Sequence, residues 1–152
     1  MSEFPNIEQS RAATFDHTGS RLLSIGKLAA AIWDATTGVR EVQFLGHSGY
    51  LLMASWSPDA SSVLTAALDG TARIWDAKSG DELAIYHHPR NVRVAAYSPD
   101  GMRIVIGDDD GTVAIHDLPQ LPADAMHRID CRVQFEIQND HPIPRDPPTC
   151  DR

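Results

Sequence analysis

Apolar runs of five to seven residues alternate along the chain with clusters of Gly, Pro, Asp and Ser. Between residues 50 and 87, the runs YLLMASW, SSVLTAA, TARIWD and ELAIYH are separated by turns that contain Pro-Asp, Asp-Gly and Ser-Gly. Short strands joined by such turns are typical of an antiparallel meander, and an Asp-Gly pair favours a tight hairpin. Several runs are apolar almost throughout, as expected of strands covered on both faces. The pattern predicts an all-β chain.

Three segments of the chain share this pattern at a fixed spacing. The stretches ATFDHTGSRLLSIG, ASWSPDASSVLTAA and AAYSPDGMRIVIGD align, and their aromatic residues Phe15, Trp56 and Tyr97 are 41 residues apart. The third strand of each segment ends on nearly the same period, in AIWD, RIWD and AIHD. Such a period is the signature of a repeat architecture in which each repeat is one supersecondary unit.

The repeats resemble the WD40 family over roughly residues 6–118. Blades of that family have Gly-His before the first strand, Ser-Pro-Asp-Gly and Asp-Gly at the first two turns, and Trp-Asp at the end of the third strand. The second repeat carries Gly46-His47, Ser57-Pro58-Asp59, Asp69-Gly70 and Trp75-Asp76. The resemblance implies an all-β chain of about three four-stranded β-propeller blades in an incomplete ring, within a C-terminal segment of a bacterial-type multi-repeat protein. A lead-in of residues 1–10 precedes the repeats at 11–118, with blades at roughly 11–45, 51–86 and 92–117.

The same resemblance implies a buried polar tetrad in the second repeat. In this family a His, a Ser or Thr, an Asp and a Trp are joined by hydrogen bonds within one blade. By position, the structural tetrad consists of His47, Thr65, Asp69 and Trp75. A closed network gives each buried polar group a partner and favours a single conformation.

The other two repeats lack parts of the tetrad. The first retains Ser24 and Trp33, but it has an Asn at the position of the His and no Asp at the turn. The third retains its His and, by position, Asp110, whereas Ile106 replaces the Ser or Thr and His116 replaces the Trp. We therefore expect one complete tetrad, with softer blades on either side of it.

Residues 119–152 depart from the repeat and contain six of the ten prolines. A helical turn could begin at Pro122. The segment CRVQFEI, residues 131–137, alternates apolar and polar side chains, which predicts a half-buried strand. Because the third repeat lacks a fourth strand of its own, we expect this segment to complete the third blade. The rest of the tail is expected to be irregular.

Composition and charge exclude several classes of function. The formal net charge of −8 and the isoelectric point near 5.2 argue against a nucleic-acid partner, which usually needs a basic face. The chain has no stretch of eighteen apolar residues and does not begin with a signal peptide pattern, so we expect no membrane association. Cys131 and Cys150 are too few for a disulfide framework, which favours a cytoplasmic location.

Two apparent metal sites are weak. The spacing of His127, Cys131, His141 and Cys150 matches no common zinc ligand pattern. The acidic residues of GDDDGT at 107–112 are consecutive, whereas a calcium-binding EF-hand loop alternates them, and the segment aligns with the Asp-Gly turn of the second repeat. We expect no metal and no cofactor.

The resemblance implies a non-catalytic scaffold for protein–protein interaction. A protein or peptide partner would bind the loops before the first strand and between the second and third strands of each blade. Residues of these loops form the candidate protein-binding rim: Lys27, Tyr50, Leu68, Arg90, Asp108 and Asp109. Tyr and Arg are the residue types that most often anchor interfaces.

Two further expectations concern the larger assembly. The alternative function is that of a C-terminal sensor or regulatory segment in a larger bacterial signalling protein with an NTPase, kinase or protease-like domain. Propellers typically have 4–8 blades, so about three blades cannot close a ring. We therefore expect a homo-oligomer or association with further propeller blades.

Overall fold

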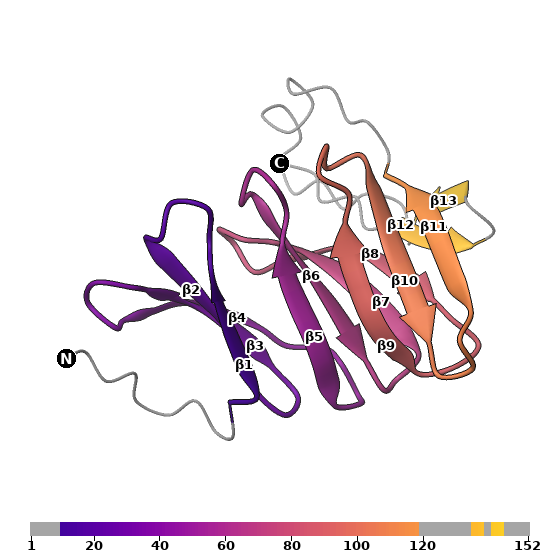
Figure 1. Ribbon diagram of the computed structural model, residues 1–152, viewed down its shortest axis with the longest axis horizontal. Coiled ribbons are helices and arrows are strands. Elements are labelled where there is room, and N and C mark those ends of the chain that lie inside the picture. The colour runs from indigo at the N-terminus through magenta and orange to yellow at the C-terminus, as the bar shows by residue number, and fades with distance from the viewer. Residues whose placement is uncertain (1–9, 119–134, 139–140, 145–152) are drawn as a thin grey trace, which may run out of the picture.

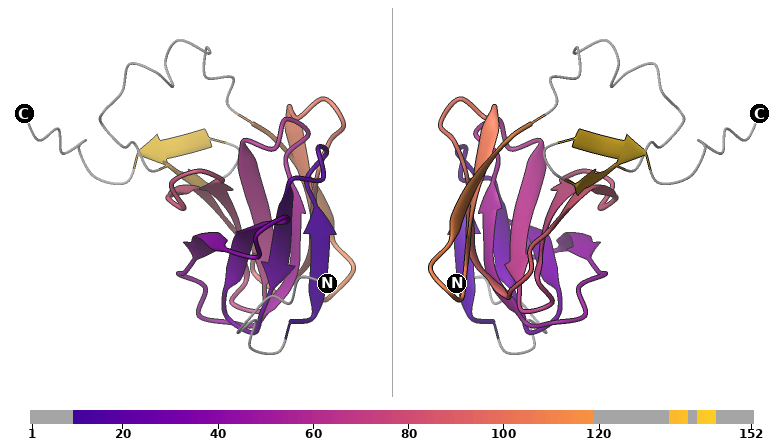
Figure 2. Two further views of the ribbon diagram at one scale, coloured as in Figure 1. Left: turned by 90° about the vertical axis from the view of Figure 1, so that its left-hand side faces the viewer. Right: turned by 90° about the vertical axis from the view of Figure 1, so that its right-hand side faces the viewer.

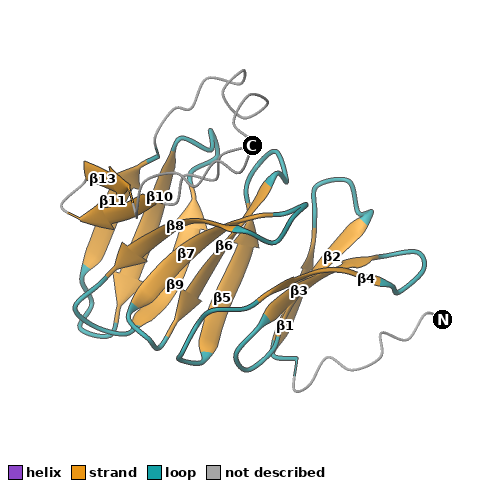
Figure 3. Cartoon of the chain, turned by 180° about the vertical axis from the view of Figure 1, so that it is seen from behind, coloured by secondary structure: helices purple, strands orange, loops and turns teal. Residues whose placement is uncertain are grey.

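All regular structure in residues 10–118, 135–138 and 141–144, the part of the chain that the structure describes, is β-strand. In this computed structural model, three sheets stand side by side along the longest dimension of the molecule (Figure 1). Figure 3 shows strands and connecting loops in the same residues, without a helix. The all-β prediction is confirmed. None of the described residues form a helix that could span a membrane.

Each sequence repeat forms one meander, and we call the three meanders blade 1, blade 2 and blade 3. Blade 1 contains β1 (Ala12–Phe15), β2 (Arg21–Ile25), β3 (Ala30–Asp34) and β4 (Arg40–Phe44). Blade 2 contains β5 (Leu51–Trp56), β6 (Ser62–Ala67), β7 (Thr71–Asp76) and β8 (Glu82–His87). Blade 3 contains β9 (Val92–Tyr97), β10 (Arg103–Asp108) and β11 (Val113–Asp117). Neighbouring strands within each blade are antiparallel.

The hydrophobic core lies between the blades, which are stacked one behind another when viewed end-on (Figure 2). Leu23 and Ile32 of blade 1 belong to one cluster with Trp75 of blade 2. A second cluster joins Leu64 of blade 2 to Ile104 of blade 3. Blade 2 is therefore covered on both faces, which explains why β6 is apolar at most of its positions and almost fully buried. By contrast, β1 is exposed along its whole length.

The tail pairs differently from the prediction. Strands β12 (Phe135–Gln138) and β13 (His141–Pro144) form a hairpin, and β12 pairs in parallel with β8 of blade 2. We expected a strand at 131–137 to complete blade 3, which has three strands in the described residues. The outermost strand of blade 2 has an open edge of backbone donors and acceptors, and β12 extends the sheet there. Residues 131–134 of the expected strand lie outside the described residues. The expected helical turn at Pro122 and both cysteines also lie outside them.

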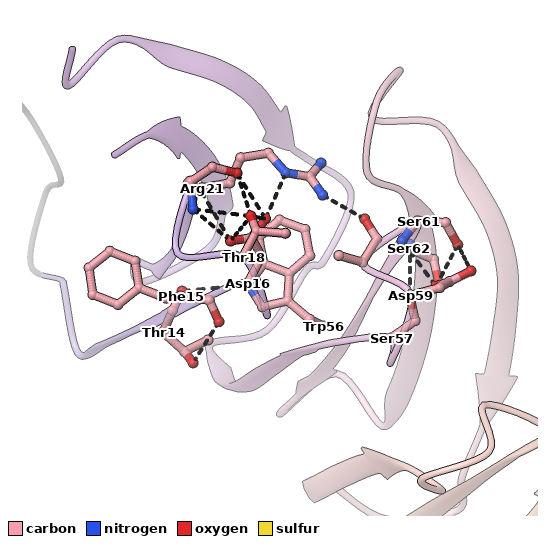
Figure 4. A network of polar contacts seen from close by, with 12 residues as sticks. Thr14, Phe15, Asp16, Thr18, Arg21, Trp56, Ser57, Asp59, Ser61 and Ser62 are labelled. Carbon is pink, nitrogen blue, oxygen red and sulfur yellow. Dashed lines mark hydrogen bonds and ion pairs between the residues drawn. The ribbon is translucent and has the colours of Figure 1, made fainter. Parts of the chain in front are cut away.

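A polar brace connects blade 1 to blade 2 at the end of the strands where β1 meets β2 (Figure 4). The guanidinium Cζ of Arg21 lies 4.7 Å from the centre of the Trp56 ring, and its Nη2 donates a hydrogen bond of 2.8 Å to the carbonyl oxygen of Ala60. Asp16 holds the guanidinium in place by accepting a hydrogen bond of 3.3 Å from Arg21 Nε. The brace fixes one blade against the next through a cation, an aromatic ring and a backbone carbonyl.

The brace predicts a specific acid sensitivity. Burial alone would raise the pKa of Asp16, but hydrogen bonds from Arg21 and Thr18 outweigh it and lower the pKa from 3.8 to about 2. Ionised Asp16 therefore stabilises the fold above pH 3.8, and this contribution is lost as the pH falls towards 2. In Asp16→Asn, the free energy of unfolding should fall less steeply across this window than in the wild type. Urea unfolding at several pH values measures both slopes, and parallel curves would contradict the assignment.

Candidate functional site

The loops at the opposite end of the strands from this brace form one continuous edge, which we call the rim. It consists of the loops β2–β3, β4–β5, β6–β7, β8–β9 and β10–β11. Backbone hydrogen bonds tie neighbouring loops together. Leu51 N donates to Lys27 O at 3.0 Å, Leu68 N to Tyr50 O at 2.9 Å, and His88 N to Gly70 O at 2.8 Å. The rim is therefore a preorganised surface.

The complete tetrad of blade 2 lies directly beneath the rim. Trp75 Nε1 donates to Thr65 Oγ1 at 2.8 Å, and Thr65 Oγ1 lies 2.7 Å from His47 Nε2. His47 Nδ1 is 2.8 Å from Asp69 Oδ2. A carboxylate only accepts, so His47 donates through Nδ1, and Nε2 accepts the proton of the Thr65 hydroxyl. The four residues assigned to the tetrad by position are thus joined in one chain of hydrogen bonds.

The charge states within the tetrad follow from burial. Burial lowers the pKa of His47 despite the neighbouring Asp69 carboxylate, so the imidazole is neutral at neutral pH. Burial alone would raise the pKa of Asp69, but hydrogen bonds from Thr71 and His47 lower it, so this carboxylate is ionised. Thr65 has no exposed surface. A hydroxyl without access to substrate cannot act as a nucleophile, so the tetrad has a structural role.

The tetrad positions of the outer blades are only partly filled. In blade 1, Trp33 Nε1 donates to Ser24 Oγ at 2.8 Å, while the turn between β2 and β3 contains no Asp. The Asn that replaces the His lies outside the described residues. In blade 3, His116 packs its ring against Tyr86 of blade 2, with ring centres 5.1 Å apart. A histidine in place of the Trp therefore contributes to packing between the blades.

Asp108, rather than Asp110, is the acidic partner in blade 3. His88 Nδ1 lies 3.0 Å from Asp108 Oδ2, whereas Asp110 accepts a hydrogen bond from Thr112 at the turn. The pairing of β10 with β9 has the same register as the pairing of β6 with β5, so Asp108 stands at the position of Ala67 and contacts the histidine from the end of its strand. Asp108 was also expected on the exposed rim, and this expectation is wrong because the residue is only 8% exposed.

The other rim candidates fall into two groups. Lys27 and Tyr50 are exposed and lie together, with Lys27 Nζ 4.7 Å from the centre of the Tyr50 ring. Arg90 and Asp109 are exposed at the blade 3 side, and Leu68 is half-buried between the groups. Arg90 pairs with Asp110 at 3.7 Å, and Asp109 pairs with the guanidinium of Arg93.

Sequence reasoning missed one residue of the first group. Arg11 Cζ lies 5.7 Å from the centre of the Tyr50 ring, so this ring is flanked by two cations. No motif marks Arg11, because its position over Tyr50 depends on how blade 1 packs against blade 2. We call Arg11, Lys27 and Tyr50 the cationic patch. Neither cation has an ion-pair partner among the described residues.

A hollow of about 490 Å³ opens beside the patch on blade 1. Lys27 and Arg40 are the charged residues among the described ones that line it, and its floor includes Ala31 and Trp33. In blade 2 the position of Ala31 is taken by Arg73, which forms an ion pair with Glu82 at 2.7 Å. The blade 1 end of the rim is therefore open and positively charged. The described residues contain no cluster of three or more His, Cys, Asp or Glu that could hold a metal ion.

Known proteins match about half of this chain. It is 43% identical over 81 residues to THO complex subunit 6 of Arabidopsis thaliana, which covers 53% of this chain and 21% of that protein. It is 38% identical over 81 residues to the human serine-threonine kinase receptor-associated protein, covering 53% of this chain and 23% of that protein. The chain thus spans about a fifth to a quarter of the length of these curated relatives. Both relatives are eukaryotic, and the expected bacterial type stays a prediction.

A solved structure matches the fold. The β-propeller domain of Cps50 (Swd1), described as from Myceliophteria thermophila, superposes with a TM-score of 0.70 at 20% sequence identity. The match covers 76% of this chain and 36% of that one. The WD domain, G-beta repeat family matches residues 38–76 and 80–117, just over half of the chain. This chain belongs to the WD40 repeat family.

Proposed function

We propose that this chain is a non-catalytic scaffold that binds a protein partner at the rim, and that the bound segment of the partner is acidic. The observation that carries the proposal is the cationic patch, in which Arg11 and Lys27 flank the exposed ring of Tyr50. The names of the relatives, a subunit of the THO complex and a receptor-associated protein, support a role in protein assemblies.

The chemistry of the patch favours an anionic partner. Each exposed cation near an aromatic ring gains about 0.5–1 kcal/mol, so the two cations hold the ring of Tyr50 without neutralising their own charge. Aspartate or glutamate side chains of a partner can form charge-assisted hydrogen bonds with both. The ring offers apolar area, and Tyr is among the residues enriched at interface hot spots.

The rest of the rim attracts an acidic segment less strongly than the cationic patch does. Arg90 and Arg93 on the blade 3 side already have carboxylate partners, so they attract an acidic segment less strongly. The chain as a whole carries a net charge of −8, which repels an acidic segment elsewhere on the surface. An acidic segment is therefore directed to the junction of blades 1 and 2. Because the loops there are tied by backbone hydrogen bonds, binding loses little conformational entropy.

Affinity capture from the native host, with identification by mass spectrometry, tests the proposal. The bait proteins are the wild type, Tyr50→Ala, Lys27→Glu and a control, Lys78→Glu. Lys78 is exposed in the β7–β8 loop at the opposite end of blade 2, so the control makes the same charge change away from the rim. We expect a partner with an acidic segment to be captured by the wild type and the control, and to be lost with the two patch variants. Identical capture by all four baits would disprove the assignment of the patch.

A further inference from the structure

The brace between blades 1 and 2 has a counterpart at the next junction. Arg21 of blade 1 contacts Trp56 of blade 2, and 41 residues further on Ser62 of blade 2 forms a hydrogen bond of 2.9 Å with Tyr97 of blade 3. Each junction therefore joins the residue that starts the second strand of one blade to the aromatic residue that ends the first strand of the next.

Continuing the period leaves one unused partner at each end of the arc. Arg103 starts the second strand of blade 3 and is exposed. Phe15 ends the first strand of blade 1, and 59% of its surface is exposed. Figure 4 shows the ring of Phe15 pointing away from blade 2, on the opposite side from Trp56. The two ends of the arc thus carry the same kind of residues that form the brace inside it, a cation on blade 3 and an aromatic ring on blade 1.

The outer face of blade 3 carries exposed apolar side chains at positions that are buried in the other two blades. One position of the third strand is Ile32 in blade 1, Ile74 in blade 2 and Ile115 in blade 3. Its exposed fraction is 0% and 7% in the first two, where the next blade covers it, and 62% in blade 3. Two residues earlier, Ala30 and Ala72 are buried, whereas Val113 is 65% exposed. Blade 3 therefore presents to solvent the surface that blades 1 and 2 bury against their successors.

We propose that blade 3 of one copy of this chain packs against blade 1 of a second copy, with Arg103 stacked on Phe15. Both halves of the contact belong to the same chain, and each reproduces a surface that already packs within it. Two copies joined at both ends provide six blades, which is within the range of closed propellers. Closure also removes from water the exposed apolar side chains of both flanks of each chain, among them Phe15, Val113 and Ile115. Such a ring has two-fold symmetry with two equal junctions.

Light scattering coupled to size-exclusion chromatography measures the association of the full chain. We expect a mass of twice the 16.7 kDa of one chain, decreasing on dilution. Ala13→Asp/Phe15→Asp, the blade 1 variant, and Val113→Asp/Ile115→Asp, the blade 3 variant, should each be monomeric. These side chains are exposed in the single chain, so the fold is expected to persist. The control Val39→Asp changes an exposed loop valine and should remain dimeric.

Mixing the two flank variants identifies the geometry of the contact. The blade 1 variant retains an intact blade 3, and the blade 3 variant retains an intact blade 1, so an equimolar mixture should recover a dimer with one junction. A wild type that is monomeric at every concentration would overturn the proposal. So would dimerisation of the blade 1 variant alone, because that result means that two blade 3 flanks pack on each other. A mixture that contains only monomers would also overturn it.

Discussion

Replacing Trp75 by alanine is expected to destabilise the protein considerably more than replacing Trp33 by alanine. Trp75 is 2% exposed, lies in the core between blades 1 and 2, and packs 5.7 Å from the ring of Phe44. Removing a buried Trp costs about 3–5 kcal/mol, and the cavity would form at the junction of two blades. The change also breaks the bond to Thr65, at the centre of the complete tetrad.

Trp33 provides the matched comparison. It is buried and donates to Ser24, but it belongs to neither of the two cores between the blades. Its replacement should therefore lower the free energy of unfolding by a smaller amount. Urea unfolding followed by circular dichroism compares the two variants with the wild type. Equal losses of stability would show that the complete tetrad and the blade junction give Trp75 no added role.

Replacing the isoleucine at the same position of the third strand should affect the free energy of unfolding strongly in blade 1 and very little in blade 3. Ile32→Ala is expected to lower the free energy of unfolding by about 2–5 kcal/mol, because Ile32 has no exposed surface and its methyl groups fill the core between blades 1 and 2. Ile115→Ala should change it by less than about 0.5 kcal/mol, because the side chain is 62% exposed in the single chain.

This second comparison requires a monomer. Both substitutions are therefore made in the blade 1 variant Ala13→Asp/Phe15→Asp, in which the proposed contact between copies is blocked. Urea unfolding then reports the packing within one chain. A loss at Ile115 as large as that at Ile32 would mean that the flank of blade 3 is covered within the single chain.

The fold could be predicted from the sequence because the information is local and repeated. The Asp-Gly turn, the Trp-Asp strand end and the 41-residue period each constrain a few residues, and the meander satisfies all of them together. The residues of the tetrad follow from the same fixed offsets. Hydrogen bonds within one blade depend on little beyond that blade, so position alone identifies His47 and Thr65 as neighbours.

What could not be predicted depends on geometry outside the local pattern. Asp108, rather than Asp110, lies beside His88, and a fixed period does not show which of three consecutive Asp residues makes this contact. The pairing of β12 with β8 joins segments about 50 residues apart, and the alternation of CRVQFEI does not specify which open edge it meets. Arg11 reaches Tyr50 only because two blades pack together.

The hydrogen bond from Leu51 N to Lys27 O has a thermodynamic consequence for the rim. It crosses from blade 2 to blade 1, and the cationic patch is likewise assembled from both blades, so the patch exists only while they are docked. A partner that binds the patch binds the docked arrangement and not the open one. By mass action, binding therefore stabilises the docked arrangement, and this stabilisation increases with the free concentration of the partner. For such a partner, binding at the patch and opening of blade 1 are linked equilibria, so a change that loosens blade 1 also weakens the binding.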